Sequence, residues 1–122
     1  MSYDITAVER NFAMKCRSEH KDLGQILEES PELVPEFTKE SRDAIIKYLT
    51  TEEPYKIESE QGSEIVFKHK TAKSVQVTLS NNTLDFSAGF SEKWTILDTT
   101  ALVTIEPGAE IMRFDFQDGE WG

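Results

Sequence analysis

The chain of 122 residues carries 13 Lys and Arg against 23 Asp and Glu, which gives a formal charge of −10 at neutral pH. Its length fits a single domain over residues 1–122, and its 38% of hydrophobic residues is too many for a disordered acidic tail. We expect no binding to nucleic acid or to an anionic membrane surface, because both require clustered Lys and Arg.

Cysteine content and the first residues predict a cytoplasmic protein. Cys16 is the single cysteine, so no disulfide can form within the chain. The start of the chain has neither the basic residues nor the apolar run of a secretory signal. No uncharged stretch approaches the ~20 apolar residues that cross a bilayer.

The first half of the chain predicts one strand and two helices. Residues 2–9 alternate in polarity, as a strand does, whereas residues 11–17 show no clear period. Ser18 is a candidate N-cap for a helix that ends before Pro31. A second helix is expected after Thr38, with its apolar stripe ending before Pro54.

The second half predicts an antiparallel meander over residues 55–90. Turns are expected at residues 60–63 and at residues 81–82, where Asn tolerates the positive φ of a tight hairpin. Residues 91–104 combine helical spacing with many β-branched residues, so helix and strand both remain open. We favour a helix with Trp94 on its buried side, followed by a strand over residues 110–116.

The expected fold class is therefore α+β. About five to six strands form an antiparallel β-meander that packs against two or three helices, because a sheet with one apolar face needs a covering layer.

Catalytic and metal sites find little support in the sequence. Cys16, His20 and Asp22 are spaced for a nucleophile, a base and its orienting group, but no glycine-rich elbow or oxyanion-hole motif accompanies them. His20 and His69 lack metal-ligand spacing, and residues 115–120 match only half of a calcium loop, for which a turn at Asp118 and Gly119 is the simpler interpretation. We predict no catalytic residue, no metal and no cofactor.

Two acid-rich segments are the main functional signal. Residues 28–60 hold ten acidic and four basic residues, and residues 98–122 hold six acidic residues and one Arg. Such a surface attracts a basic protein partner, although it is also compatible with an ordinary soluble surface. Trp121 is either a binding anchor or a residue that closes the sheet edge. The predicted partner-binding residues are Glu28, Glu29, Glu32, Glu36, Asp115, Asp118, Glu120 and Trp121.

Three short pieces resemble known bacterial proteins. Residues 1–5 resemble the start of several families of small bacterial proteins. Residues 84–90 and residues 114–121 are similar to segments of small acidic immunity proteins that are encoded beside polymorphic or contact-dependent toxins. The resemblance implies tight, reversible inhibition of a cognate toxin, commonly a nuclease with a basic active-site cleft, and it assigns no binding residue.

Two other functions remain as alternatives. The aromatic residues, seven Phe and three Tyr, can instead line the pocket of a small-ligand or regulatory binding domain without catalytic activity. A hydrolase that uses Cys16 or clustered carboxylates is the third hypothesis.

Overall fold

The computed structural model describes residues 2–52, 54–104 and 109–122. In chain order the described elements are β1 (Ser2–Glu9), α1 (Arg10–Ser18), α2 (Leu23–Glu29), the 3₁₀ helix η1 (Pro31–Leu33), α3 (Lys39–Thr51), β2 (Tyr55–Gln61), β3 (Glu64–His69), β4 (Gln76–Leu79), β5 (Leu84–Gly89), the 3₁₀ helix η2 (Phe90–Glu92), α4 (Lys93–Val103), β6 (Ile111–Asp115) and β7 (Glu120–Trp121).

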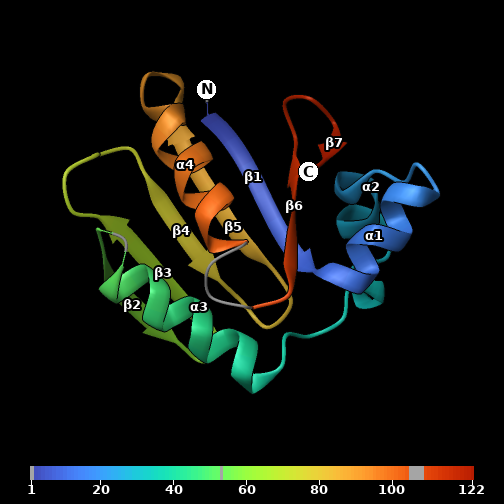
Figure 1. Cartoon of the computed structure of the whole chain (residues 1–122), viewed down its shortest axis with the longest axis horizontal. Helices are drawn as coiled ribbons and strands as arrows, with labels where there is room; N and C mark the ends of the chain where they lie inside the picture. Colours follow the sequence, from blue (N-terminus) through green and yellow to red (C-terminus); the bar gives the residue numbers. More distant parts are fainter. Residues whose placement is uncertain (1, 53, 105–108) are drawn as a thin grey trace.

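The strands form one antiparallel sheet in the order β2-β3-β4-β5-β1-β6-β7 (Figure 1). Strands β2 to β5 are the predicted meander, and β1 is inserted between β5 and β6. The α+β class is confirmed. The sheet has seven strands in the described part of the chain, more than the five to six expected, and the short β7 was not predicted as a strand.

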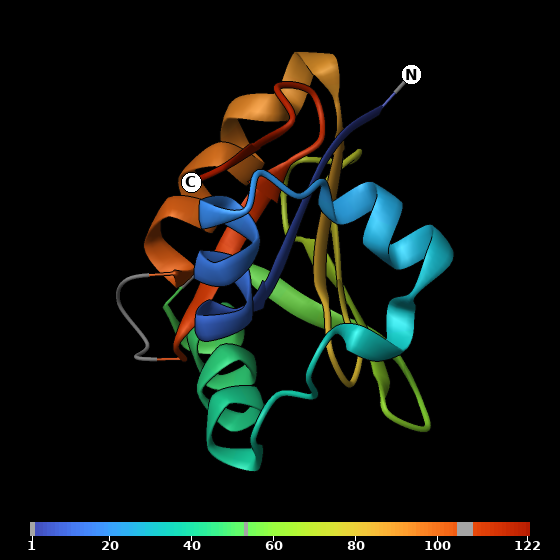
Figure 2. The same ribbon diagram turned by 90° about the vertical axis from the view of Figure 1, so that its right-hand side faces the viewer.

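The helices lie on both faces of the sheet, as the view along its edge shows (Figure 2). α3 and α4 cover one face, and α2 lies on the opposite side. The main core fills the space beneath α3 and α4. Its largest members are fully buried: Ile5, Tyr55, Phe67, Phe86, Leu49 and Ile96.

A second core lies on the other face, where α1 and α2 pack against β1 and β6. Its buried members are Val8, Ala13, Leu23, Val34 and Phe114, and the partly buried Phe12, Ile26, Leu27, Met112, Phe116 and Trp121 surround them. The sequence predicts a sheet with one apolar face covered by helices. Strands β1 and β6 instead supply apolar side chains to both faces.

The N-terminal helices differ from the prediction. α1 begins immediately after β1, where the Glu9 carboxylate accepts the backbone N–H groups of Asn11 and Phe12 at 2.8 and 3.0 Å. Ser18 is the last residue of α1 and caps no helix, so that prediction is wrong. The cap of α2 is Asp22, which accepts the N–H of Gln25. Thr38 caps α3 as predicted, through the N–H of Ser41.

Residues 93–103 form a helix, which confirms the favoured alternative, but the side of α4 that faces the core was predicted wrongly. Trp94 is 67% exposed. Thr99 and Thr100 are buried instead, because both hydroxyls bond to helix carbonyls and to partners in the sheet. Thr99 Oγ1 lies 2.9 Å from the Tyr55 hydroxyl, and Thr100 Oγ1 accepts a hydrogen bond from Arg113 at 2.7 Å.

The turns and the sheet edges limit where the sheet can extend. Gly62 and Gly119 take the positive φ that their turns require. The Asn81–Asn82 turn also forms, bridged by the hydrogen bond from the Ser80 N–H to the Thr83 carbonyl, although neither Asn takes the expected positive φ.

At one edge of the sheet β2 is exposed and charged after its first residue, and at the other edge β7 has two residues. Among the described helices, none combines the length and apolar character that crossing a membrane requires. Pro107 and Gly108, a pair typical of a helix end or of a hairpin turn, lie outside the described residues.

The central strands carry a partly buried carboxylate on the face opposite α3 and α4. Asp85 on β5 pairs in register with Thr6 on β1 and with Thr78 on β4. The Thr6 hydroxyl donates to Asp85 Oδ1 at 2.6 Å, and the Thr83 hydroxyl donates to Oδ2 at 3.4 Å. Burial raises the pKa of the Asp85 carboxyl, although these two hydrogen bonds act in the opposite direction.

The substitution Asp85→Asn should therefore stabilise the protein at neutral pH. A raised folded-state pKa means that ionisation of Asp85 costs the folded state free energy once the pH rises above the ordinary carboxyl value of about 4. The variant should melt at a higher temperature than wild type at pH 7, and the difference should vanish near pH 3. Thermal unfolding followed by circular dichroism measures both. The exposed Asp98→Asn is the control, and an equal gain in it would contradict the assignment to burial.

Candidate partner-binding surface

The first group of predicted binding residues lies along α2 and the segment that follows it. Glu28 and Glu29 end α2, Glu32 lies in η1, and Glu36 lies in the connection to α3. All four side chains are exposed. This run is held in place by Val34, which is buried in the second core, and by Asn82, whose side-chain amide donates to the Val34 carbonyl.

The second group lies where β6 turns into β7. Asp118 and Glu120 are exposed, whereas Asp115 is engaged within the protein. Asp115 Oδ2 accepts the hydroxyl of Tyr3 at 2.5 Å, and Oδ1 accepts the backbone N–H of Gln117 at 2.8 Å. The hydrogen bond to Asp115 is the main cause that raises the pKa of Tyr3 to about 12. Asp115 therefore organises the turn, and it has less freedom to meet a partner than its neighbours.

The second core joins these two groups, although about 80 positions separate them in the sequence. The Phe116 ring lies against Gly24 in the first turn of α2. Trp121 packs edge-on against Phe114, with ring centroids 4.9 Å apart, and its indole N–H donates to the carbonyl of Lys21 at 2.9 Å. Trp121 thus closes the sheet edge, one of its two predicted roles, and is only partly exposed.

The exposed acids of both groups lack neutralising neighbours. Within the described residues the ion pairs join Lys21 to Glu19 and Lys39 to Asp43, and none involves the predicted binding acids. Glu29 accepts a long hydrogen bond from Gln25, at 3.4 Å. These carboxylates are therefore available to accept hydrogen bonds from another molecule.

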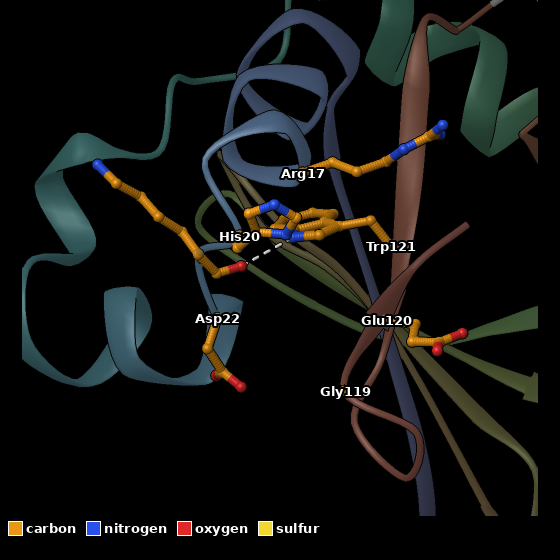
Figure 3. A pocket seen from close by; sticks show the side chains of 7 residues that line it. Arg17, His20, Asp22, Gly119, Glu120 and Trp121 are labelled. Atoms are coloured by element: carbon orange, nitrogen blue, oxygen red, sulfur yellow. Dashed lines mark hydrogen bonds between the residues drawn. The ribbon is translucent and has the colours of Figure 1, made fainter.

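A surface cleft adjoins the second group, between the end of α1 and β7 (Figure 3). Its walls include Arg17, His20, Asp22, Glu120 and Trp121. The Arg17 side chain extends away from Asp22, and the carboxylates of Asp22 and Glu120 point to different sides. Asp22 is also committed to capping α2. The charged groups of the cleft are of both signs and do not converge on a common point, so the cleft has no arrangement for acid–base work.

Cys16, His20 and Asp22, the candidate nucleophile, base and orienting group, do not form a catalytic triad in the structure. Cys16 is 3% exposed, and burial raises the pKa of its thiol, which is the opposite of nucleophile activation. His20 is exposed and takes a positive φ of 56° in the turn after α1. In the part of the chain that the structure describes, no three His, Cys, Asp or Glu side chains are grouped closely enough to hold a metal ion.

The aromatic residues expected to line a ligand pocket mainly fill the two cores. Tyr55, Phe67 and Phe86 are fully buried in the main core, and Phe114 is fully buried in the second. The surface clefts beside α1 and α2 are lined by other residues, which are charged, polar and apolar, and they contain none of these buried rings. This arrangement gives the ligand-binding alternative no enclosed aromatic cavity among the pockets described.

The exposed apolar residues of α4 were not predicted from the sequence. Trp94 and Leu102 are 67% and 40% exposed, although both lie in a helix that covers the main core. The sequence does contain a sign of this exposure. When residues 93–103 are drawn as a helix, apolar side chains occur around most of its circumference, and a sheet can bury only one side of the helix.

Trp121→Phe should lower the free energy of unfolding by about 1–2 kcal/mol, because it removes the hydrogen bond to the Lys21 carbonyl and part of the ring packing on Phe114. The matched substitution of the other tryptophan, Trp94→Phe, should change it by less than about 0.5 kcal/mol. Urea denaturation compares the two. Equal losses would contradict the structural role of Trp121.

Comparison of the chain with protein-family models, with curated proteins and with solved structures found no match. The site must therefore be interpreted from its own residues.

Proposed function

We propose that this chain is a bacterial immunity-type protein, which binds a cognate toxin domain through an acidic surface and neutralises it. A nuclease is the expected toxin class. The supporting observation is that the second core places the exposed acids of α2 and η1 and those of the β6–β7 turn on elements that pack together. These acids are not neutralised within the described part of the chain.

The physical argument concerns association with a polyanion-binding site. A nuclease must attract phosphates with Lys and Arg, and a protein of net charge −10 is attracted to the same groups. Long-range attraction raises the association rate, and close charge pairs at the interface slow dissociation. Blocking a cleft in this way requires shape and charge, and it requires no catalytic group on the inhibitor.

The test uses the product of the gene adjacent to the one that encodes this chain. We expect the two proteins to copurify, the chain to inhibit the activity of that product, and the affinity to fall as salt rises. A variant with Glu28, Glu29, Glu32 and Glu36 all changed to Gln should associate roughly tenfold more slowly at low salt. Surface plasmon resonance measures the rates.

The matched control changes four exposed glutamates elsewhere, Glu40, Glu52, Glu58 and Glu60, to Gln. Both variants carry the same net charge, so only the location of the lost charges differs. If both variants associate equally slowly, the net charge alone sets the association rate. The proposal that the acids of α2 and η1 form the binding surface would then be wrong. Absence of any binding to the adjacent gene product would overturn the proposed function itself.

A further inference from the structure

Helix α4 carries an apolar stripe on its outer side. Its three exposed positions, Trp94, Asp98 and Leu102, are four residues apart and so lie on one face of the helix. Two of the three are large and apolar. Phe90 in η2, which is 39% exposed, extends the apolar surface beyond the first turn of α4.

The fold does not require this stripe. α3 covers the same face of the sheet as α4, and its exposed positions are all polar: Lys39, Glu40, Asp43, Lys47 and Thr51. A helix in this layer can therefore present a wholly polar outer side. Exposed Trp, Phe and Leu side chains that are grouped in one place are typical of an interaction surface, and Trp is among the residues that contribute most to binding energy.

The surroundings of the stripe hold it in a fixed position. Tyr3 contacts Phe90 edge-on, with ring centroids 5.8 Å apart, and its hydroxyl is bonded to Asp115 in the β6–β7 region. The Lys93 ammonium lies 5.3 Å from the centre of the Trp94 ring. Phe90 is thus connected through Tyr3 to Asp115 at the β6–β7 turn, and Lys93 lies beside the rings of both Tyr3 and Trp94.

We propose that the Phe90–Trp94–Asp98–Leu102 face, hereafter the α4 face, binds an amphipathic segment of the partner that presents apolar side chains flanked by Lys or Arg. The apolar side chains of that segment cover Trp94 and Leu102, and a cation pairs with Asp98 between them. This inference rests on the proposed function for the basic character of the partner, and it adds the apolar contact.

A second copy of the chain is a poor occupant. Each copy carries a charge of −10, so two copies repel each other. In a symmetric pairing of α4 helices that places each Trp94 on the partner's Leu102, the Asp98 side chains of the two copies would also face each other. A basic segment of another protein avoids both costs.

The experiment uses three labelled peptides of equal length and helical amphipathic pattern, built from Leu and Lys, from Leu and Glu, and from Ser and Lys. Fluorescence anisotropy measures their binding to the full chain. We expect saturable binding of the Leu–Lys peptide, with the other two at least about tenfold weaker. Trp94→Ser and Asp98→Asn should each weaken Leu–Lys binding, the former by about tenfold.

The control is Met14→Ser, which removes an apolar side chain that is 52% exposed in α1, outside both the α4 face and the predicted binding acids. It should bind the Leu–Lys peptide as wild type does, and circular dichroism verifies that each variant is folded. The proposal for the α4 face would be wrong if Trp94→Ser left binding of the Leu–Lys peptide unchanged, or if that peptide showed no saturable binding. A wild-type dimer that Trp94→Ser dissociates in analytical ultracentrifugation would also overturn it, because the occupant would then be a second copy.

The peptides represent no particular toxin, so the two proposals fail separately. Failure of the adjacent gene product to bind would refute the immunity function, whereas peptide binding that is independent of Trp94 would refute the α4 face alone.

Discussion

Strand β1 pairs with β5 on one side and with β6 on the other, and it sends apolar side chains into both cores. Ile5 and Ala7 enter the main core, whereas Val8 enters the second. Both registers are thereby fixed, because a shift of one residue would exchange the two faces of the strand. The position of the β6–β7 turn follows from the register with β6, and so does the place where Phe116 and Trp121 meet the start of α2.

The two cores have different consequences for the molecule. The main core holds the meander and α3 and α4 together and contains most of the large buried side chains. The second core is smaller, and it attaches α1 and α2 to the last two strands through Phe114, Phe116 and Trp121. The second core holds α2, η1 and the β6–β7 turn together, and these carry the predicted binding acids. A mutation in this core is therefore expected to disturb their arrangement before it unfolds the sheet.

Local patterns predicted much of the fold. The alternation of residues 2–9 matched β1, and Thr38 was correctly placed as a cap, since both depend on neighbours in sequence. α1 was not predicted because its cap is the carboxylate of Glu9 at the end of a strand, where no turn separates the two elements. The inner side of α4 was predicted wrongly because buried Thr hydroxyls found partners in Tyr55 and Arg113, which only the tertiary structure supplies. The same limit applies to the site: composition revealed the acids, but not that the elements carrying them pack together, nor that Trp94 is exposed.

The protected sheet edges limit how this fold can evolve new interactions. A charged β2 and a two-residue β7 discourage a partner from adding a strand to the sheet, so the proposed interactions use side chains of the helices and turns. Trp94, Asp98 and Leu102 point away from the main core, so substitutions at these positions leave its packing intact. If the α4 face binds a partner as proposed, duplicated copies of the gene can change partner through substitutions at these three positions while the rest of the fold stays unchanged.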